Sequence, residues 1–231
     1  FVDEEFKKEL LSKNIKLSSA NSINIGRLIP QVVYYVVSYL DLVNTNKIKL
    51  NDKVNFVVPT GNFGNILAGY YAEQIGLPVN KLVCASNNNN VLYDFLTTGV
   101  YDKNRDFLKT VSPSMDILIS SNLERLLYYI SGCDNAYIAK LMKDLKETGR
   151  FEVTSEVLDK IKDKFQAGFA DDEQTKETIK AIYEKDNYLL DTHTAVAYKV
   201  LLDNLDNEHA SIVLSTASPY KFTESVYSSL F

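Results

Sequence analysis

The chain has 231 residues, and 45% of them are apolar, which is enough to form the core of one large domain or of two small ones. Its formal net charge of -5, without a long basic run, argues against a nucleic-acid partner. No apolar stretch approaches the length of a membrane span, so we expect no membrane partner either.

The chain has only two cysteines and two histidines, which limits its metal and redox chemistry. Cys84 and Cys133 stand in apolar sequence without the spacing of metal ligands, which predicts buried, reduced thiols in a cytoplasmic protein. Two histidines are too few for a multi-histidine centre, and we predict no metal site. The sequence begins with Phe1 and stops at Phe231 inside a helical pattern, so we interpret it as a portion of a longer protein.

The first expected element is a buried helix over residues 27–42, in which Pro30 predicts a late start or a kink near the beginning. A strand follows at residues 54–58, where β-branched and aromatic residues dominate. This strand runs directly into a turn that contains Gly61 and Gly64 and opens a helix.

This unit of strand, turn and helix is the most informative part of the sequence. Gly61 and Gly64 let the backbone approach a ligand closely, and Asn65 can cap the helix. The first amides of a helix have no partner within it and its dipole favours negative charge, so the unit predicts a phosphate-binding turn. Similar units also occur in crossovers that bind nothing, and that alternative stays open. The turn lacks the Lys-Ser/Thr pair of a nucleoside triphosphate loop and the glycine spacing of a dinucleotide turn, which leaves a small flat ligand or one with a single phosphate.

The elements that follow predict a parallel sheet. We expect a strand at residues 81–86 and a helix at residues 91–98. Strands that alternate with helices are typical of a parallel-sheet core flanked by helices, so the expected fold class is α/β. Further along, Ser121 and Glu124 have the spacing of a capping box, which predicts a helix that ends near Gly132.

The composition changes after residue 150. Residues 151–190 carry charged amphipathic helices, which predicts a peripheral helical subdomain, and residues 191–231 return to the earlier pattern. The elements expected in these two segments are helices at 157–165, 173–183 and 194–205, a buried strand at 211–215, and a last helix after the turn at 217–219. We therefore divide the chain into part of an α/β large domain over residues 1–150, the helical subdomain over 151–190, and a return to the α/β domain over 191–231.

Three separated segments together resemble the threonine synthase family. They are SANSINIGRLIPQ at residues 19–31, VPTGNFGNILAGYYA at 58–72 and LSTASPYKF at 214–222. SPSMDILISSNLER at 112–125 and DTHTAVAYKV at 191–200 are similar to the same family in the same order, so the likeness covers most of the chain outside residues 151–190. The resemblance implies the tryptophan-synthase β fold (fold type II of pyridoxal-phosphate enzymes), here partial and with a helical insertion.

The resemblance also implies a site for pyridoxal 5'-phosphate (PLP). Backbone amides would wrap the cofactor phosphate at Gly61, Asn62, Phe63, Gly64 and Asn65. The family places a hydroxyl residue against the pyridine nitrogen, and the matching position is Thr216, with Ser215 as the alternative. A hydroxyl cannot keep a proton on the ring as a carboxylate would, so the cofactor would suit elimination and replacement reactions. Without the resemblance, we would interpret Thr216 as a hydroxyl at the end of a strand that bonds a nearby backbone group.

For the substrate phosphate, the family uses an Asn-Ser pair and an arginine, which match Asn21, Ser22 and Arg27. Guanidinium binds phosphate through two parallel hydrogen bonds, and an amide and a hydroxyl at a helix start add donors. The alternative is that Asn21 and Ser22 only cap the helix and that Arg27 is a solvated charge.

The resemblance implies that the parent protein is a lyase of threonine biosynthesis, which converts O-phospho-L-homoserine and water into L-threonine and phosphate. The family's Schiff-base lysine would lie upstream of this chain, and no lysine here stands in a matching motif. We therefore expect no catalytic residue within the chain and no activity of the chain alone. Two alternatives stay open: a phospholyase on the same scaffold, and a non-catalytic homologue that binds phosphate or PLP.

Several other residues carry less specific signals. His193 matches a family position, but we expect a structural histidine in the first turn of a helix. Asn87–Asn90 could approach the cofactor or form a turn before a helix. Glu124 and Arg125 could form an ion pair or an interdomain contact. Core packing is expected for three tyrosines, Tyr34, Tyr35 and Tyr39.

Overall fold

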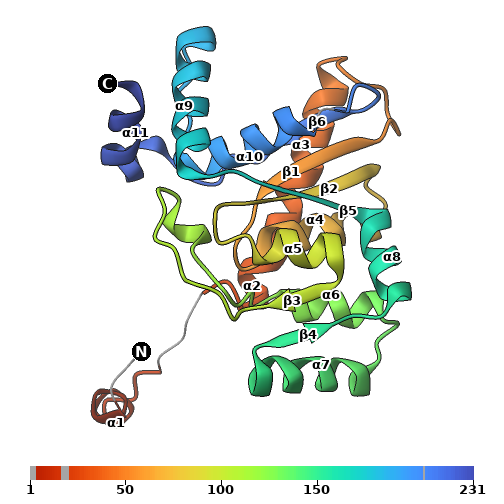
Figure 1. Cartoon of the computed structure of the whole chain (residues 1–231), viewed down its shortest axis with the longest axis vertical. Coiled ribbons are helices and arrows are strands. Elements are labelled where there is room, and N and C mark those ends of the chain that lie inside the picture. Colours follow the sequence, from red (N-terminus) through yellow and green to blue (C-terminus); the bar gives the residue numbers. More distant parts are fainter. Residues whose placement is uncertain (1–3, 17–20, 205) are drawn as a thin grey trace.

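The computed structural model describes residues 4–16, 21–204 and 206–231 (Figure 1). Ser19 and Ala20 of the first family segment, and Leu205 at the end of an expected helix, lie outside the described residues.

A parallel sheet organises the described part of the chain. Its four strands are β1 (Val54–Pro59), β2 (Val79–Ser86), β5 (Phe165–Phe169) and β6 (Ala210–Val213), in the order β5-β2-β1-β6. All three pairings are parallel, and Val57 of β1 lies opposite Val83 of β2 and Val213 of β6. Parallel neighbours need long crossovers, which is why helices separate the strands along the chain. The expected α/β class with a parallel-sheet core is confirmed.

The remaining elements surround this sheet. The helices are α1 (Glu4–Ser12), α2 (Ile25–Leu28), α3 (Val32–Asn44), α4 (Gly64–Gln74), α5 (Val91–Thr98), α6 (Leu123–Ile130), α7 (Asn135–Thr148), α8 (Ser155–Lys164), α9 (Asp172–Asp186), α10 (Thr192–Asp203) and α11 (Thr223–Leu230). Short 3-10 helices are η1 (Ile29–Gln31), η2 (Pro113–Met115) and η3 (Pro219–Phe222), and β3 (Val100–Asp102) pairs antiparallel with β4 (Arg150–Glu152).

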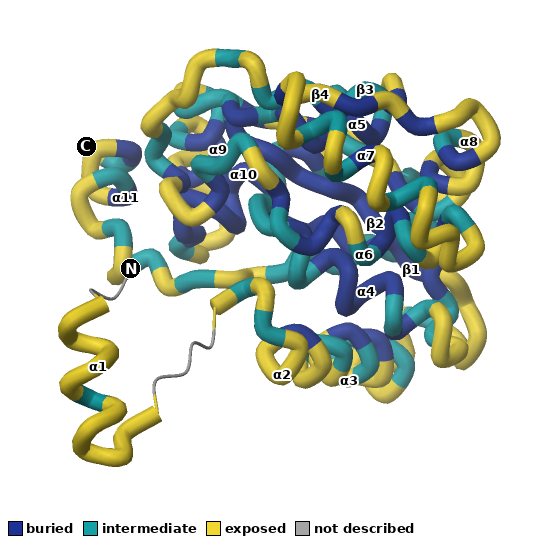
Figure 2. The backbone as a smooth tube through the Cα atoms, turned by 90° about the horizontal axis from the view of Figure 1, so that it is seen from below, coloured by how far each residue is buried: buried dark blue, intermediate teal, exposed yellow. Residues whose placement is uncertain are grey.

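Helices bury the sheet on both faces (Figures 1 and 2). Val57 of β1 packs in one cluster with Val83 and with Val196 of α10. Phe56 and Val58 point to the other face, into the large core formed with α3, α4 and α5. Because β1 is covered on both sides, all six of its residues are buried, which explains why apolar residues occupy every position except Asn55.

The expected helix over residues 27–42 is interrupted at Pro30. The segment forms α2, then η1 with Pro30 inside it, and then α3. Proline has no amide hydrogen and its ring clashes with the preceding turn, so it interrupts a regular helix. The sequence predicted a late start or a kink, and the structure shows a 3-10 turn at Pro30 with the long helix α3 starting after it, at Val32.

Strand β5 was not predicted from the sequence. It lies within residues 151–190, where it pairs with β2 and places Phe165 opposite Leu82. The interpretation of this segment as purely helical and peripheral is therefore wrong, because the segment supplies a strand of the main sheet. The strand is short and contains Gly168, a residue that strands disfavour, so its pattern is weak. The division of the chain at residues 150 and 190 stays a prediction.

Two local predictions around α6 are also wrong. The helix begins after Asn122 rather than Ser121, and no side chain of the described residues caps it. Cys84 is buried, but Cys133 is exposed, in a left-handed turn with φ 64° that follows α6. Its main-chain amide donates to the Tyr128 carbonyl at 2.8 Å, which closes the end of the helix.

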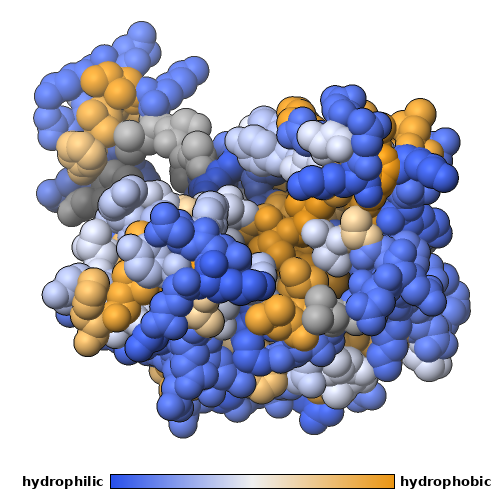
Figure 3. Space-filling model, turned by 90° about the horizontal axis from the view of Figure 1, so that it is seen from above, coloured by the Kyte–Doolittle hydropathy of each residue, from blue (hydrophilic) through white to orange (hydrophobic). Residues whose placement is uncertain are grey.

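The surface is mixed in character. In Figure 3 polar side chains cover most of the visible face, and apolar surface gathers in a hollow between them. Helix α1 has no buried residue and stands apart from the sheet in Figures 1 and 2. Over the described ranges, no helix combines the length and the apolar character needed to cross a bilayer.

Candidate functional site

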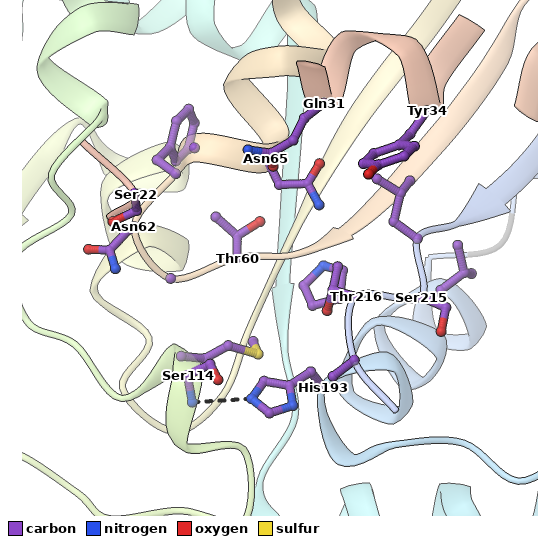
Figure 4. A pocket seen from close by; sticks show the side chains of 18 of the residues that line it. Ser22, Gln31, Tyr34, Thr60, Asn62, Asn65, Ser114, His193, Ser215 and Thr216 are labelled. Atoms are coloured by element: carbon purple, nitrogen blue, oxygen red, sulfur yellow. Dashed lines mark hydrogen bonds between the residues drawn. The ribbon is translucent and has the colours of Figure 1, made fainter. Parts of the chain in front are cut away.

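A cavity of about 780 Å³ opens where β1 and β6 end (Figure 4). Residues 59–65 form one wall, directly after β1, and residues 212–217 form another at the end of β6. Residues of α2, η1 and α3 close a third side, among them Arg27, Gln31 and Tyr34. Ligands of parallel α/β sheets bind at the carboxyl ends of the strands, which is the position of this cavity.

The structure brings almost all predicted site residues to this cavity. Gly61–Asn65, Ser215 and Thr216 line it, together with Ser22 and Arg27. Asn21 does not line it, because its exposed side chain turns back and accepts a hydrogen bond from the Ile23 amide at 3.1 Å. The roles assigned to these residues stay predictions, although tertiary structure collects them in one place.

The turn after β1 has an unusual backbone. Phe63 adopts the left-handed conformation, with φ 62°, which is rare for an aromatic residue and costs about 1–3 kcal/mol. Its side chain is buried and its ring centroid lies 5.8 Å from that of Phe165, so core packing holds this conformation. Helix α4 begins at Gly64 without a side-chain cap from any described residue. The start of α4 therefore offers its amides to an anion in the cavity.

Asn65 does not cap α4, and that prediction is wrong. Asn65 lies inside the first turn of the helix, and its side-chain oxygen is 3.0 Å from the Tyr35 hydroxyl. Helix α2 is capped by Asn24, whose side chain accepts from the Gly26 amide at 2.8 Å. The alternative that Asn21 and Ser22 serve as its cap is therefore wrong as well.

The two glycines of the turn differ in their surroundings. A Cβ atom on Gly61 would lie 3.0 Å from the Ser114 carbonyl oxygen and 3.2 Å from the Cα of Met115. Gly61 is therefore needed because the main chain of η2 packs closely against it. A Cβ atom on Gly64 would find its nearest neighbour, Nδ2 of Asn122, at 3.4 Å, which is an ordinary contact.

His193 connects η2 to α10. It lies in the first turn of α10, as predicted, and its buried ring lines the cavity. Nε2 accepts from the Ser114 amide at 3.1 Å (dashed in Figure 4), so the ring proton belongs on Nδ1, which lies 3.1 Å from an Asp191 oxygen. Burial raises the pKa of Asp191, but hydrogen bonds from His193 and Thr194 oppose it, and the pKa is lowered overall. The buried Asp191 carboxylate thereby fixes the tautomer of His193 whose Nε2 accepts from the Ser114 amide.

The two hydroxyls at the end of β6 are not equivalent. Oγ of Ser215 lies 3.3 Å from the Thr194 hydroxyl, which also bonds Asp191. The Thr216 hydroxyl has no hydrogen-bond partner among the described residues. It is therefore available to a ligand in the cavity, and the interpretation of Thr216 as a hydroxyl that bonds the nearby backbone has no support in the structure.

The sequence missed several lining residues. Tyr34 was expected in the core with Tyr35 and Tyr39, but it is 63% exposed and lines the cavity, while the other two are buried. Lys221 also lines it, and its Nζ stands 5.5 Å from the centroid of the Phe222 ring. Its position in the same motif as Thr216 was an available signal.

The asparagine run does not reach the cavity. The side-chain amides of Asn87 and Asn89 donate to Asp116 at 2.8 and 3.0 Å, and thereby hold the loop that precedes η2. Of the two interpretations, the structure supports the turn before a helix.

Comparison with known proteins gives a consistent result. A comparison with protein-family models finds no match. Threonine synthase-like 1 of Homo sapiens is 42% identical over 216 residues, which cover 93% of this chain and 29% of that protein. Threonine synthase of Saccharomyces cerevisiae is 40% identical over 240 residues, which cover 96% of this chain and 46% of that protein.

Solved structures agree with these relatives. The PLP-bound threonine synthase of Brucella melitensis has a TM-score of 0.89 and 40% identity, over 96% of this chain and 48% of that one. Threonine synthase from yeast has a TM-score of 0.86 and 38% identity, over 98% of this chain and 46% of that one. The chain spans about half the length of these threonine synthases and a smaller part of the human relative. Sequence and fold together show that the chain belongs to the threonine synthase family, with the fold type II architecture.

Proposed function

We propose that the protein containing this chain is a PLP-dependent lyase that converts O-phospho-L-homoserine and water into L-threonine and phosphate. The observation that carries this proposal is one cavity that collects the start of α4, the Thr216 hydroxyl and Arg27. The likeness to proteins named threonine synthase over almost the whole chain supports it. A cytoplasmic location remains part of the proposal.

The donor groups of the cavity fit PLP. The uncapped start of α4 favours an anion such as the cofactor phosphate, and the Thr216 hydroxyl suits a pyridine nitrogen. The volume of about 780 Å³ also lies within the range of small-molecule sites, roughly 300–1,000 Å³. When bound, PLP would supply the electron sink for elimination and replacement.

Each residue would then have a distinct task. The amides of Gly64 and Asn65 would hold the cofactor phosphate, and Thr216 would orient the ring without fixing a proton on its nitrogen. Arg27 and the Ser22 hydroxyl would bind the substrate phosphate and neutralise the charge that develops as it leaves. For Asn21, whose side chain bonds the Ile23 amide, we propose a role in shaping this segment.

The lysine that bonds the cofactor covalently would come from a part of the protein outside this chain. Lys221 lines the cavity, but it stands in no motif that matches the family's lysine. We therefore propose that the chain alone is inactive.

The test uses the full-length protein with PLP and O-phospho-L-homoserine. We expect threonine and phosphate as products, and Arg27→Ala should raise KM by about 10- to 100-fold, which corresponds to the loss of one charged hydrogen-bonding group. Visible cofactor absorbance should stay intact in this variant. Arg150→Ala is the control, because Arg150 is exposed on β4 and its nearest acidic partner, Glu152, lies 3.8 Å away.

Three outcomes would count against the proposal. Full-length protein that takes up no PLP would refute the cofactor assignment. A keto acid in place of threonine would identify a phospholyase on the same scaffold. Unchanged kinetics in Arg27→Ala would remove Arg27 from the phosphate site.

A further inference from the structure

Asn122 joins the two parts of the cavity for which we propose phosphate binding. It immediately precedes α6 and is fully buried. Its side-chain Nδ2 donates to the main-chain carbonyl of Ser22 at 2.9 Å and to that of Asn62 at 2.8 Å. Its main-chain amide donates to the same Asn62 carbonyl at 3.1 Å. One side chain thus bonds both the segment before α2 and the turn after β1.

Arg125 fixes the orientation of the Asn122 side chain. Nη1 of Arg125 donates to Oδ1 of Asn122 at 2.5 Å, and Nη2 donates to the Ile23 carbonyl at 2.7 Å. A guanidinium group only donates hydrogen bonds, so the asparagine oxygen must face Arg125 and its nitrogen must face the two carbonyls. No ion pair joins Glu124 and Arg125 among the described residues, and Arg125 instead holds Asn122 and the Ser22–Ile23 segment together.

This arrangement has a consequence for the cavity. Ser22 and Asn62 lie on the same side of it in Figure 4, away from Ser215. The segment before α2 and the turn after β1 are not strands of a common sheet in the described part of the chain, and the Asn122 side chain bonds both of them. Removing the Asn122 side-chain amide would leave the Ser22 carbonyl without this donor and the Asn62 carbonyl with only the main-chain amide of residue 122. A carbonyl that stays buried without a donor costs about 1–3 kcal/mol.

We propose that Asn122 is a positioning residue, oriented by Arg125, that makes the cofactor-phosphate site and the substrate-phosphate site form together. This inference rests on the proposed function. Asn122 lines neither site and acts only through the backbone positions of Ser22 and Asn62. Its loss should therefore weaken both ligands, whereas the loss of Arg27 should weaken the substrate alone.

The experiment measures PLP affinity, the KM for O-phospho-L-homoserine and inhibition by inorganic phosphate in the full-length protein. For Asn122→Ala we expect roughly tenfold weaker PLP binding and a roughly tenfold higher KM and phosphate inhibition constant. Turnover at saturating PLP and substrate should fall by a smaller factor than the rise in KM. Arg125→Lys keeps the charge but cannot bond both the Asn122 side chain and the Ile23 carbonyl as the guanidinium does, so it should weaken both ligands to an intermediate extent.

Asn55→Ala is the matched control. Asn55 is also a buried asparagine, but it lies at the opposite end of β1 from the cavity, where it accepts from Asn80 at 2.9 Å and donates to Asp206 at 3.0 Å. Its replacement should lower the unfolding temperature as Asn122→Ala does, and should leave PLP affinity and KM within about twofold of wild type.

The outcomes separate the two proposals. If wild-type protein binds PLP and phosphate, and Asn122→Ala binds both as tightly, the positioning role is wrong and the proposed function stands. Equal weakening in Asn55→Ala and Asn122→Ala would assign the effect to general stability, which also overturns the inference. If Asn122→Ala does not fold, Arg125→Lys decides: wild-type affinity for both ligands in that variant rejects the role. Wild-type protein without PLP affinity would refute the proposed function itself.

Discussion

The hydroxyl of Tyr35 donates a hydrogen bond to the main-chain carbonyl of Asn65 at 2.8 Å and lies 3.0 Å from the side-chain oxygen of the same residue. Tyr35 is fully buried in α3, whereas Asn65 belongs to the first turn of α4 and lines the cavity. Burial raises the pKa of Tyr35 well above its usual value, so the hydroxyl keeps its proton and stays a donor. A core side chain thus holds the start of α4, where we propose that the cofactor phosphate binds.

Tyr35→Phe tests this link. The variant should lose about 0.5–1.5 kcal/mol of unfolding free energy, the value of one hydrogen bond, and its PLP affinity should fall several-fold in the full-length protein. Urea unfolding and PLP titration measure the two effects. Tyr39→Phe is the control on the same helix, because the Tyr39 hydroxyl accepts from the Asn51 amide at 2.8 Å. It should lose similar stability and keep its PLP affinity, and equal affinities in both variants would contradict the link.

Asp191→Asn should change the pH dependence of stability. The folded-state pKa of Asp191 is lowered, so the unfolded chain takes up a proton first as the pH falls. The contribution of Asp191 is therefore complete above the unfolded value of about 3.9 and is lost as the pH falls through the folded-state pKa. Asparagine still caps α10 but carries no charge toward His193, so we expect a loss of about 1–2 kcal/mol at pH 7.

Urea unfolding at pH 7 and pH 3 measures the difference in unfolding free energy between wild type and Asp191→Asn, which should be smaller at pH 3. Asp134→Asn is the control, since Asp134 caps α7 at an exposed position. This control variant should lose less than about 0.5 kcal/mol of unfolding free energy at either pH. A gap between wild type and Asp191→Asn that grows toward pH 3 would show that the carboxylate does not stabilise the fold in the manner described.

Gly61→Ala and Gly64→Ala should differ in stability. The new Cβ at position 61 would press on the main chain of Ser114 and Met115, which can relieve the contact only by moving η2. We expect a loss of about 1–3 kcal/mol there. At position 64 the nearest atom is 3.4 Å away, and alanine favours a helix by up to about 1 kcal/mol, so stability should be unchanged or slightly higher. Thermal unfolding of both variants checks the order, and the reverse order would refute this account of the turn.

Lys221→Gln should leave the covalent link to PLP intact in the full-length protein. Lys221 lines the cavity, but we assign the linking lysine to another part of the protein. Borohydride reduction followed by peptide mass spectrometry should find the reduced cofactor outside residues 1–231, in wild type and variant alike. Reduced cofactor found on Lys221 in the wild type, or loss of the covalently bound cofactor in the variant, would make Lys221 the linking residue.

The local units of this protein could be predicted from short stretches of its sequence. The strand at β1, the glycine turn and α4 follow from a largely apolar run, two glycines and a helical pattern, all within about twenty neighbouring residues. Helix α5 has the predicted bounds, and Pro30 interrupts the helical segment as its chemistry requires. The motifs at residues 58–72 and 214–222 also indicated the family, because each is a contiguous stretch of sequence.

Contacts between residues far apart in the sequence became visible in the folded chain alone. Strand β5 joins the sheet because β2 offers it a free edge, although its own five residues carry a weak strand pattern. Tyr34 faces the cavity while Tyr35 is buried in the core. Successive side chains on a helix differ in direction by about 100°, and the packing of α3 on α4 determines which of them face the core. Asn122 bonds Ser22 and Asn62 only because the fold places all three together. Hydrogen bonds between such distant positions produce no periodic pattern in a sequence. The contacts that shape the cavity could therefore not be predicted from the sequence.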